Sequence, residues 1–185
     1  MKGLKKILVY FGIILLLIFL LRGWIFRYAI SYTKIGERNN IEITNSKLIK
    51  EINLAKQKKH LSINEIIAIS NNITKRKLYF STSKTSSNPN ELFEKRAANC
   101  IGYASFFNAV ANYLIKDQKE EKKYKANHLI GSISFLTINL HQFFDRPFFR
   151  DHDFNEIVII ETGEKIFVDP SISDYLGIDR ISCQQ

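Results

Sequence analysis

The sequence predicts an α+β domain, with helices packed on an antiparallel sheet and one transmembrane helix in front. Three observations lead to this fold class. Residues 7–26 are nearly all apolar, segments between 46 and 115 carry apolar residues at helical spacing, and segments after 125 are rich in β-branched residues. Helices followed by strands are typical of the α+β class. With 185 residues, the chain has room for one ordinary domain and a short appendage.

The appendage is the N-terminal segment, residues 1–27. Fifteen uncharged residues (7–21) follow a lysine-rich start, and extending the run to Phe26, with Trp24 at the headgroups, gives about 20 residues, enough to span a bilayer. A secretory signal peptide has the same basic flank, but no A-x-A-like cleavage site follows, which favours an uncleaved anchor. We expect a cytoplasmic N-terminus and an extracytoplasmic domain, because large domains translocate with little regard to charge.

The net charge of +9 is concentrated in this appendage. Five basic and no acidic residues lie in the first 27, leaving 22 basic and 18 acidic residues for the rest. An excess of +4 does not indicate a nucleic-acid surface, so we expect no nucleic-acid partner. Anionic lipid headgroups are a candidate for weak contact.

Residues 28–45 are expected to form a stalk, with room for a short strand over 41–44. The domain is expected to occupy 46–185. It opens with a helix over 46–58, where apolar residues recur at helical spacing. Oligomeric state is left open by the sequence.

A second helix is expected over 63–75. It starts with "SINE", in which Ser62 and Glu65 have the spacing of a capping box. The polar stretch 81–91 is expected to be a loop, with Pro89 as its breaker.

A third helix is expected over 100–115, because Ala104, Phe107, Ala111 and Leu114 follow each other at steps of three or four. Extending the stripe backwards by four residues places Cys100 on the same apolar face. A cysteine there can be the first core residue of the helix.

After residue 125 the pattern changes to strands. Residues 128–140 alternate loosely, 155–161 form a short apolar run, and 164–169 follow a Thr-Gly turn at 162–163. Two strands joined by a glycine-containing turn predict a β-hairpin.

The two cysteines, Cys100 and Cys183, admit several interpretations. A disulfide between them is permitted outside the cytoplasm, but Cys183 lies three residues from a polar terminus that is expected to fray. Neither cysteine has a second cysteine or a histidine within four residues, so no zinc site and no other metal is expected.

Cysteine nucleophiles need a helix start or a cation that favours the thiolate, an imidazole, and a group that orients the imidazole. Cys100 opens a helix, His152 precedes a strand, and Asp169 ends the next strand. The expected hairpin places Asp169 opposite Glu156, four residues from His152, so a bend near Phe154 is needed to bring the ring back. His128 and His141 lack a following strand that ends in Asp-Pro.

These residues lie in "NCIGYASFFNAV", "HDFNEIVI" and "IFVDPS", which resemble the three blocks of the transglutaminase-like superfamily. The resemblance covers about residues 47–178. It implies a papain-like α+β core in which Cys100 is the nucleophile, His152 the general base and Asp169 its orienting group. The chain departs from the family in having Phe154 where tryptophan is common and no glycine directly before the cysteine.

The resemblance implies acyl transfer or amide hydrolysis on a protein or peptide substrate, through a thioester and without a cofactor. The oxyanion is expected to be held by the Cys100 N–H and one further donor, for which Asn99 is a candidate. An aromatic cluster, Phe143, Phe144, Phe148 and Phe149, is expected either to wall the cleft or to form core under a loop. The alternative function is an inactive scaffold that binds a peptide or a cell-envelope partner.

Overall fold

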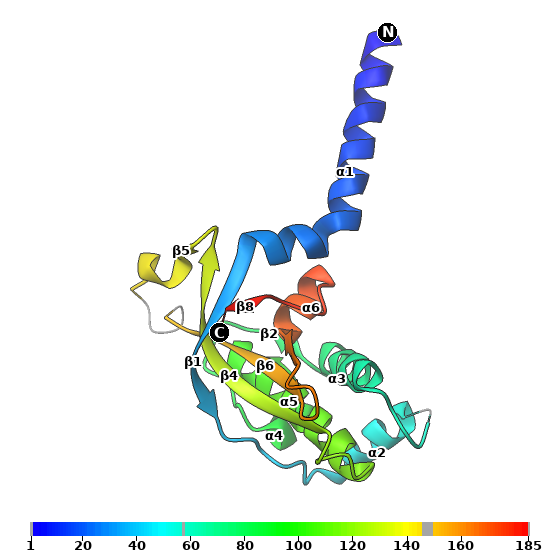
Figure 1. Ribbon diagram of the computed structural model, residues 1–185, viewed down its shortest axis with the longest axis vertical. Helices are drawn as coiled ribbons and strands as arrows, with labels where there is room; N and C mark the ends of the chain where they lie inside the picture. Colours follow the sequence, from blue (N-terminus) through cyan, green and yellow to red (C-terminus); the bar gives the residue numbers. More distant parts are fainter. Residues whose placement is uncertain (1, 57, 146–149, 185) are drawn as a thin grey trace.

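The computed structural model (Figure 1) describes residues 2–56, 58–145 and 150–184. It has the expected α+β composition, with a long N-terminal helix, a curled sheet and helices packed against that sheet. The order of the main sheet is β7-β6-β4-β1-β8.

The main sheet is mixed, whereas an antiparallel sheet was expected. Its strands are β1 (Ile30–Arg38), β4 (Tyr124–Phe135), β6 (His152–Ile159), β7 (Lys165–Val168) and β8 (Cys183–Gln184), with β5 (Ile138–Asn139) paired to β4. The pairs β1–β4, β4–β6 and β6–β7 are antiparallel, but β8 returns from α6 to run parallel to β1. A second small sheet pairs β2 (Tyr79–Phe80) with β3 (Ala97–Ala98) in parallel.

The three helices expected in the domain are present with shifted ends, as α2 (Ser46–Ala55), α3 (Ile63–Lys77) and α5 (Cys100–Asp117). The sequence patterns did not predict α4 (Pro89–Lys95), the 3-10 helix η1 (Leu140–Phe143) or α6 (Pro170–Leu176). The capping box of α3 is confirmed, because Ser62 Oγ accepts from the Glu65 N–H at 3.4 Å and Glu65 accepts from the Ser62 N–H at 2.9 Å. Pro89 does not break a loop; it is the first residue of α4, after the N-cap Asn88, where its missing N–H costs nothing.

Helix α5 is the centre of the core. It packs on α3 on one side and on β4 and β6 on the other. Phe106, Phe107, Val110 and Leu114 are buried at this junction, together with Ile157 of β6. The N-terminus of α5, which carries Cys100, is thereby held in a fixed place against the sheet.

The expectation of a stalk over 28–45 is wrong for residues 30–38. Residues Ile30–Arg38 form β1, which pairs along β4 and buries Tyr32 completely. The sequence of this strand gives only a weak strand signal, because it contains the exposed charged residues Lys34 and Glu37 and a glycine. Cross-strand pairing orders it. No strand forms over 41–44; there Asn90 Oδ1 accepts from the N–H groups of Thr44 and Asn45 at 2.7 and 2.9 Å.

Helix α1 (Lys2–Ala29) stands away from the domain over most of its length (Figure 1). Residues Lys5–Ala29 are long and apolar enough to cross a membrane, a test that a signal sequence also passes. The chain passes from Ala29 directly into β1.

Gly131 lies in β4 between β1 and β6, and its close packing gives a stability prediction. A Cβ there would lie 2.5 Å from Phe154 Cε1 and 2.8 Å from the Thr33 carbonyl oxygen. We expect Gly131→Ala to lower the free energy of unfolding by about 1–3 kcal/mol, because neither the ring nor the backbone can withdraw. Urea unfolding of the full chain in detergent, followed by near-UV circular dichroism, measures this.

Gly36→Ala is the matched control for this substitution. Its added Cβ would meet Ile130 Cδ1 at an ordinary 3.5 Å, so the free energy should change by less than about 1 kcal/mol. Equal effects of the two substitutions would contradict the packing described at Gly131.

Candidate active site

Cys100 lies at the first position of α5 and is 6% exposed. Asn99 caps this helix, with its side-chain oxygen accepting from the Gly102 N–H at 3.1 Å. The first N–H groups of a helix have no partner within the helix, and they create a positive end that favours an anion. The thiol therefore occupies a position that suits a thiolate. Asn99 Oδ1 accepts as the cap, which leaves the side-chain amide Nδ2 as the atom of Asn99 that could donate to an oxyanion.

The thiol lines a cleft of about 240 Å³. Its other lining residues are Phe80, Thr82, Ile133, Leu140, His141, Phe144, Asp151 and His152. Half of these eight side chains are apolar, and they include His152, the expected partner of the cysteine. Of the aromatic cluster expected from the sequence, Phe144 lines the cleft, whereas Phe148 and Phe149 lie outside the described residues.

The hairpin of β6 and β7 brings His152 to Asp169. Asn155 pairs with Val168, so the next residue, Asp169, is level with Phe154. The expected pairing was wrong by two residues. His152 lies two residues from Phe154 on the same face of β6, and a diagonal neighbour at this spacing is within side-chain reach without a bend. His152 Nε2 lies 2.7 Å from Asp169 Oδ2.

Asp169 is fully buried and is surrounded by donors. Its Oδ2 contacts His152 and accepts from the Tyr32 hydroxyl at 2.8 Å. Its Oδ1 accepts from the Ser171 N–H at 2.9 Å, the Ser171 hydroxyl at 2.6 Å and the Ile172 N–H at 3.2 Å, which makes Asp169 the N-cap of α6. A buried carboxylate with this many donors is fixed in its orientation.

Tyr32 is the residue of this site that the sequence interpretation missed. It lies in β1, in the segment expected to be a stalk, and its ring meets that of His152 edge-on with centroids 5.9 Å apart. Burial and the neighbouring Asp169 carboxylate raise the pKa of Tyr32 well above its usual value, so its hydroxyl stays a hydrogen-bond donor. The only signal in the sequence was a tyrosine in an alternating segment that leads out of an apolar helix.

The electrostatics of the pair favour an imidazolium. Burial opposes a charge on His152, but the Asp169 carboxylate, with a further contribution from a hydrogen bond to the Cys100 thiol, raises the His152 pKa to about 10. Burial likewise opposes the charge on Asp169, whereas His152, Ser171 and Tyr32 together lower the pKa of that carboxyl. Because Nε2 of His152 faces Asp169, Nδ1 is the nitrogen left for the thiol.

A second His–Asp pair joins β4 to β6. His128 Nε2 contacts Asp153 Oδ2 at 2.7 Å, and Arg38 makes a two-point ion pair with the same carboxylate. His128 and Asp153 are 3% and 0% exposed. His128 is thus a core histidine satisfied by a buried anion, and only His152 of the two lines the cleft together with Cys100.

Cys183 takes no part in the site. Both cysteines are free, and Cys183 lies in β8, paired to Tyr32 rather than frayed. Within the described ranges, no group of three or more His, Cys, Asp or Glu side chains is placed to hold a metal ion.

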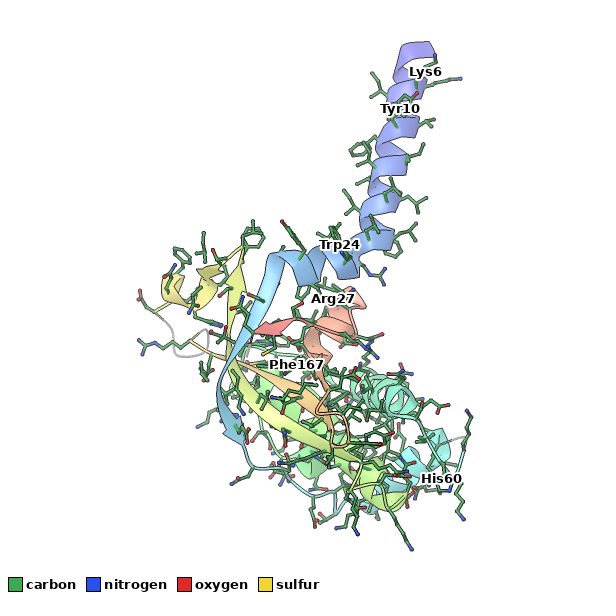
Figure 2. All side chains as sticks on the ribbon, in the orientation of Figure 1. Lys6, Tyr10, Trp24, Arg27, His60 and Phe167 are labelled. Atoms are coloured by element: carbon green, nitrogen blue, oxygen red, sulfur yellow. The ribbon has the colours of Figure 1, made fainter. Side chains whose placement is uncertain are left out.

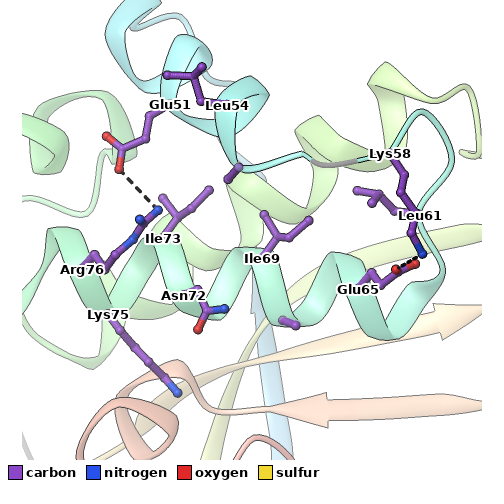
Figure 3. Close-up of a pocket in the computed structure, with 12 residues that line it drawn as sticks. Glu51, Leu54, Lys58, Leu61, Glu65, Ile69, Asn72, Ile73, Lys75 and Arg76 are labelled. Atoms are coloured by element: carbon purple, nitrogen blue, oxygen red, sulfur yellow. Dashed lines mark hydrogen bonds and ion pairs between the residues drawn. The ribbon is translucent and has the colours of Figure 1, made fainter.

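A larger hollow, of about 730 Å³, lies between α2 and α3 (Figure 3). The charged side chains around it pair with one another, Arg76 with Glu51 at 3.8 Å and Lys58 with Glu65 at 2.7 Å. None of the three candidate catalytic residues lines it. Because it offers no nucleophile, we do not place the active site there.

The chain was compared with protein families, curated proteins and solved structures. No protein-family model, no curated protein and no solved structure matches the chain. The resemblance to the transglutaminase-like superfamily therefore stays an expectation, based on three sequence blocks.

The Asp169–His152 pair generates a pH prediction. The proton on His152 should be lost with a midpoint near pH 10. Asp169→Asn removes the nearest anion, which favours the neutral ring, so the midpoint should fall by about 1 pH unit or more. Histidine-labelled full-length protein in micelles, titrated by NMR, measures both midpoints.

His152→Gln identifies the His152 signal by its disappearance. A midpoint that is the same in the wild type and in Asp169→Asn would show that the carboxylate does not stabilise the imidazolium.

Proposed function

We propose that the protein is a membrane-anchored cysteine enzyme with a papain-like, transglutaminase-like core, which transfers or hydrolyses acyl groups of protein or peptide amides. The observation that carries the proposal is that Cys100 and His152 line one cleft, in which His152 Nε2 lies 2.7 Å from the buried Asp169 carboxylate. A nucleophile, a base and a group that orients the base are the parts that such chemistry needs.

The reaction follows from these positions. The Cys100 thiolate attacks the amide carbonyl carbon, and the resulting oxyanion accepts a hydrogen bond from the Cys100 N–H at the start of α5. The His152 imidazolium gives its Nδ1 proton to the leaving amine as the C–N bond breaks, which leaves a thioester and a neutral ring. Water or a second amine then attacks the thioester, His152 takes the proton of the attacking group, and the acyl product leaves Cys100.

The surrounding residues support this cycle by holding His152 in one tautomer. Tyr32 and Ser171 hold the Asp169 carboxylate, and Asp169 holds Nε2 of the ring. Nδ1 is therefore the ring nitrogen that gives and takes the proton in both halves of the reaction. No step needs a metal or a cofactor.

We propose further that α1 is retained as an anchor, with the N-terminus in the cytoplasm and the domain outside. The support is that the last turns of α1 are bonded to the domain. The Ala29 carbonyl accepts from the Leu136 N–H at 2.8 Å, and the Arg27 carbonyl accepts from the Ser182 hydroxyl at 3.1 Å. Cleavage between α1 and β1 would remove these contacts.

The second candidate is a scaffold that has lost catalysis and binds a peptide or a cell-envelope partner. The burial of Cys100, at 6% exposure, favours it. The two candidates differ in one measurable property, the reactivity of the thiol.

Alkylation of Cys100 at acidic pH distinguishes them. In full-length Cys183→Ser protein, we expect iodoacetamide to label Cys100 at pH 6 at least about tenfold faster than in the same protein carrying His152→Ala. An ordinary thiol is under about 1% thiolate at that pH, whereas the imidazolium stabilises the anion. Mass spectrometry follows the labelling.

Two controls accompany this experiment. Cys100→Ser leaves Cys183, a thiol whose pKa is raised by burial, for comparison, and the urea-unfolded chain shows the rate without burial. Slow labelling of Cys100 both with and without His152 would remove the support for an enzyme and favour the scaffold.

A further inference from the structure

The turn between β4 and β5 lies beside the end of the membrane helix. Phe135 pairs with Ile30, the first residue of β1, and the Leu136 N–H donates to the carbonyl of Ala29, the last residue of α1. In Figure 1, β5 and the neighbouring η1 lie at the end of the domain where α1 joins it, whereas α2 lies at the opposite end.

This turn presents apolar side chains to the outside. Phe135, Leu136 and Ile138 are 45%, 51% and 50% exposed, and Phe143 of η1 is 66% exposed. We call these four residues the apolar tip.

The backbone conformation of this turn is unfavourable for the residues that it contains. Leu136 and Thr137 both have positive φ, 46° and 78°. Two-residue turns with positive φ at both positions strongly prefer Asn-Gly or Gly-Gly, because a β-carbon is strained there. The chain thus places a leucine where glycine or asparagine would be more stable in water.

The tip also lacks charge. No Lys, Arg, Asp or Glu occurs between Lys125 and Asp145, although 24% of the whole chain is charged. Charged residues on a turn of this kind would oppose entry into a lipid layer.

Three contacts fix the domain to the last turns of α1. Two are the bonds of Ala29 and Arg27 described above. In the third, the Arg22 guanidinium donates to the carbonyls of Leu176 and Gly177 at 3.0 and 3.4 Å, at the C-terminal end of α6. The labelled Trp24 and Arg27 lie in this part of α1 (Figure 2).

An aromatic pair lies in the same turns of the helix. Trp24 stacks on Tyr28 with ring centroids 5.7 Å apart, and the two side chains are 62% and 74% exposed. Tryptophan and tyrosine at the end of a spanning helix are typical of the membrane–water interface.

We propose that the apolar tip inserts into the bilayer interface beside α1, so that the domain lies against the membrane rather than above it. This inference rests on the anchored topology of the proposed function, but not on catalysis. The partner is the lipid interface, because α1 carries the tip to that layer without an intervening linker.

The size of the tip favours lipid over a protein partner. Four half-exposed side chains cover far less than the roughly 800 Å² per partner that a stable protein interface buries. A lipid interface needs no shape complementarity.

Docking of the tip would also place the cleft that holds Cys100 close to the membrane surface. Ile133, which precedes the tip in the chain, and Leu140, which lies between Ile138 and Phe143, line the cleft together with Cys100. Ile133 is two residues from Phe135, about 7 Å along the strand. The amide that reaches Cys100 therefore belongs to a peptide segment at the membrane surface.

The chain has one native tryptophan, Trp24, so replacing it and adding one elsewhere gives a single fluorescent probe. Trp24→Phe with Leu136→Trp places one tryptophan on the tip, and the full chain is reconstituted into phosphatidylcholine vesicles whose acyl chains are brominated near the headgroup. We expect brominated lipid to quench this tryptophan at least threefold more strongly than it quenches the control.

The control is Trp24→Phe with Leu54→Trp. Leu54 is also an exposed leucine, at 75%, but it lies on α2 at the far end of the domain. Equal quenching of the two tryptophans overturns the proposal. So does loss of Leu136→Trp quenching on raising the protein-to-lipid ratio, because a second copy of the chain would then cover the tip.

Cys100 alkylation at pH 6 is measured on the same vesicles, which separates the two ideas. Strong quenching with an inert thiol supports docking and contradicts the enzyme. A reactive thiol without quenching supports the enzyme and contradicts docking.

Discussion

The buried carboxylate of Asp169 is the interaction on which the rest of the site depends. It joins β1 through Tyr32, β6 through His152 and α6 through the N–H groups of Ser171 and Ile172. A charge without partners in this position would cost several kcal/mol, so the fold is stable only when all three elements are in place. The hydrogen bonds that stabilise the buried Asp169 carboxylate also fix the orientation of the His152 imidazole. Asp169 thus both joins the three elements and positions the histidine.

The three candidate catalytic residues could be chosen from the sequence because each has a local signal. A cysteine at a helix start, a histidine before a strand and an aspartate before a proline are recognisable within a few residues. The register of the β6–β7 hairpin, which brings His152 and Asp169 together, was harder to predict. Whether Asp169 is level with Phe154 or Glu156 depends on how many residues the turn at 162–163 takes up, and the sequence does not determine that number.

Tyr32 and the second His–Asp pair could not be predicted for a different reason. β1 is a strand because β4 supplies its hydrogen bonds, and its own residues alternate too weakly to show it. His128 and Asp153 face each other from different strands, 25 residues apart in the chain. Long-range pairs of this kind leave no pattern in one sequence. The longer helices α2, α3 and α5 have periodic, local signals and were predicted to within a few residues at each end, whereas the short helices α4, η1 and α6 were not predicted.

Helix α6 has seven residues and is fastened at both ends, at its start by Asp169 and at its end by Arg22. A helix of this length is about 10 Å long. It thus acts as a short strut between α1 and the His152–Asp169 pair. The bonds of Arg22 are exposed and those of Asp169 are buried, so a change in the tilt of α1 breaks the Arg22 bonds first, because water replaces exposed hydrogen bonds at little cost. A movement of α1 against the domain is therefore absorbed at Arg22, and the geometry around His152 stays unchanged.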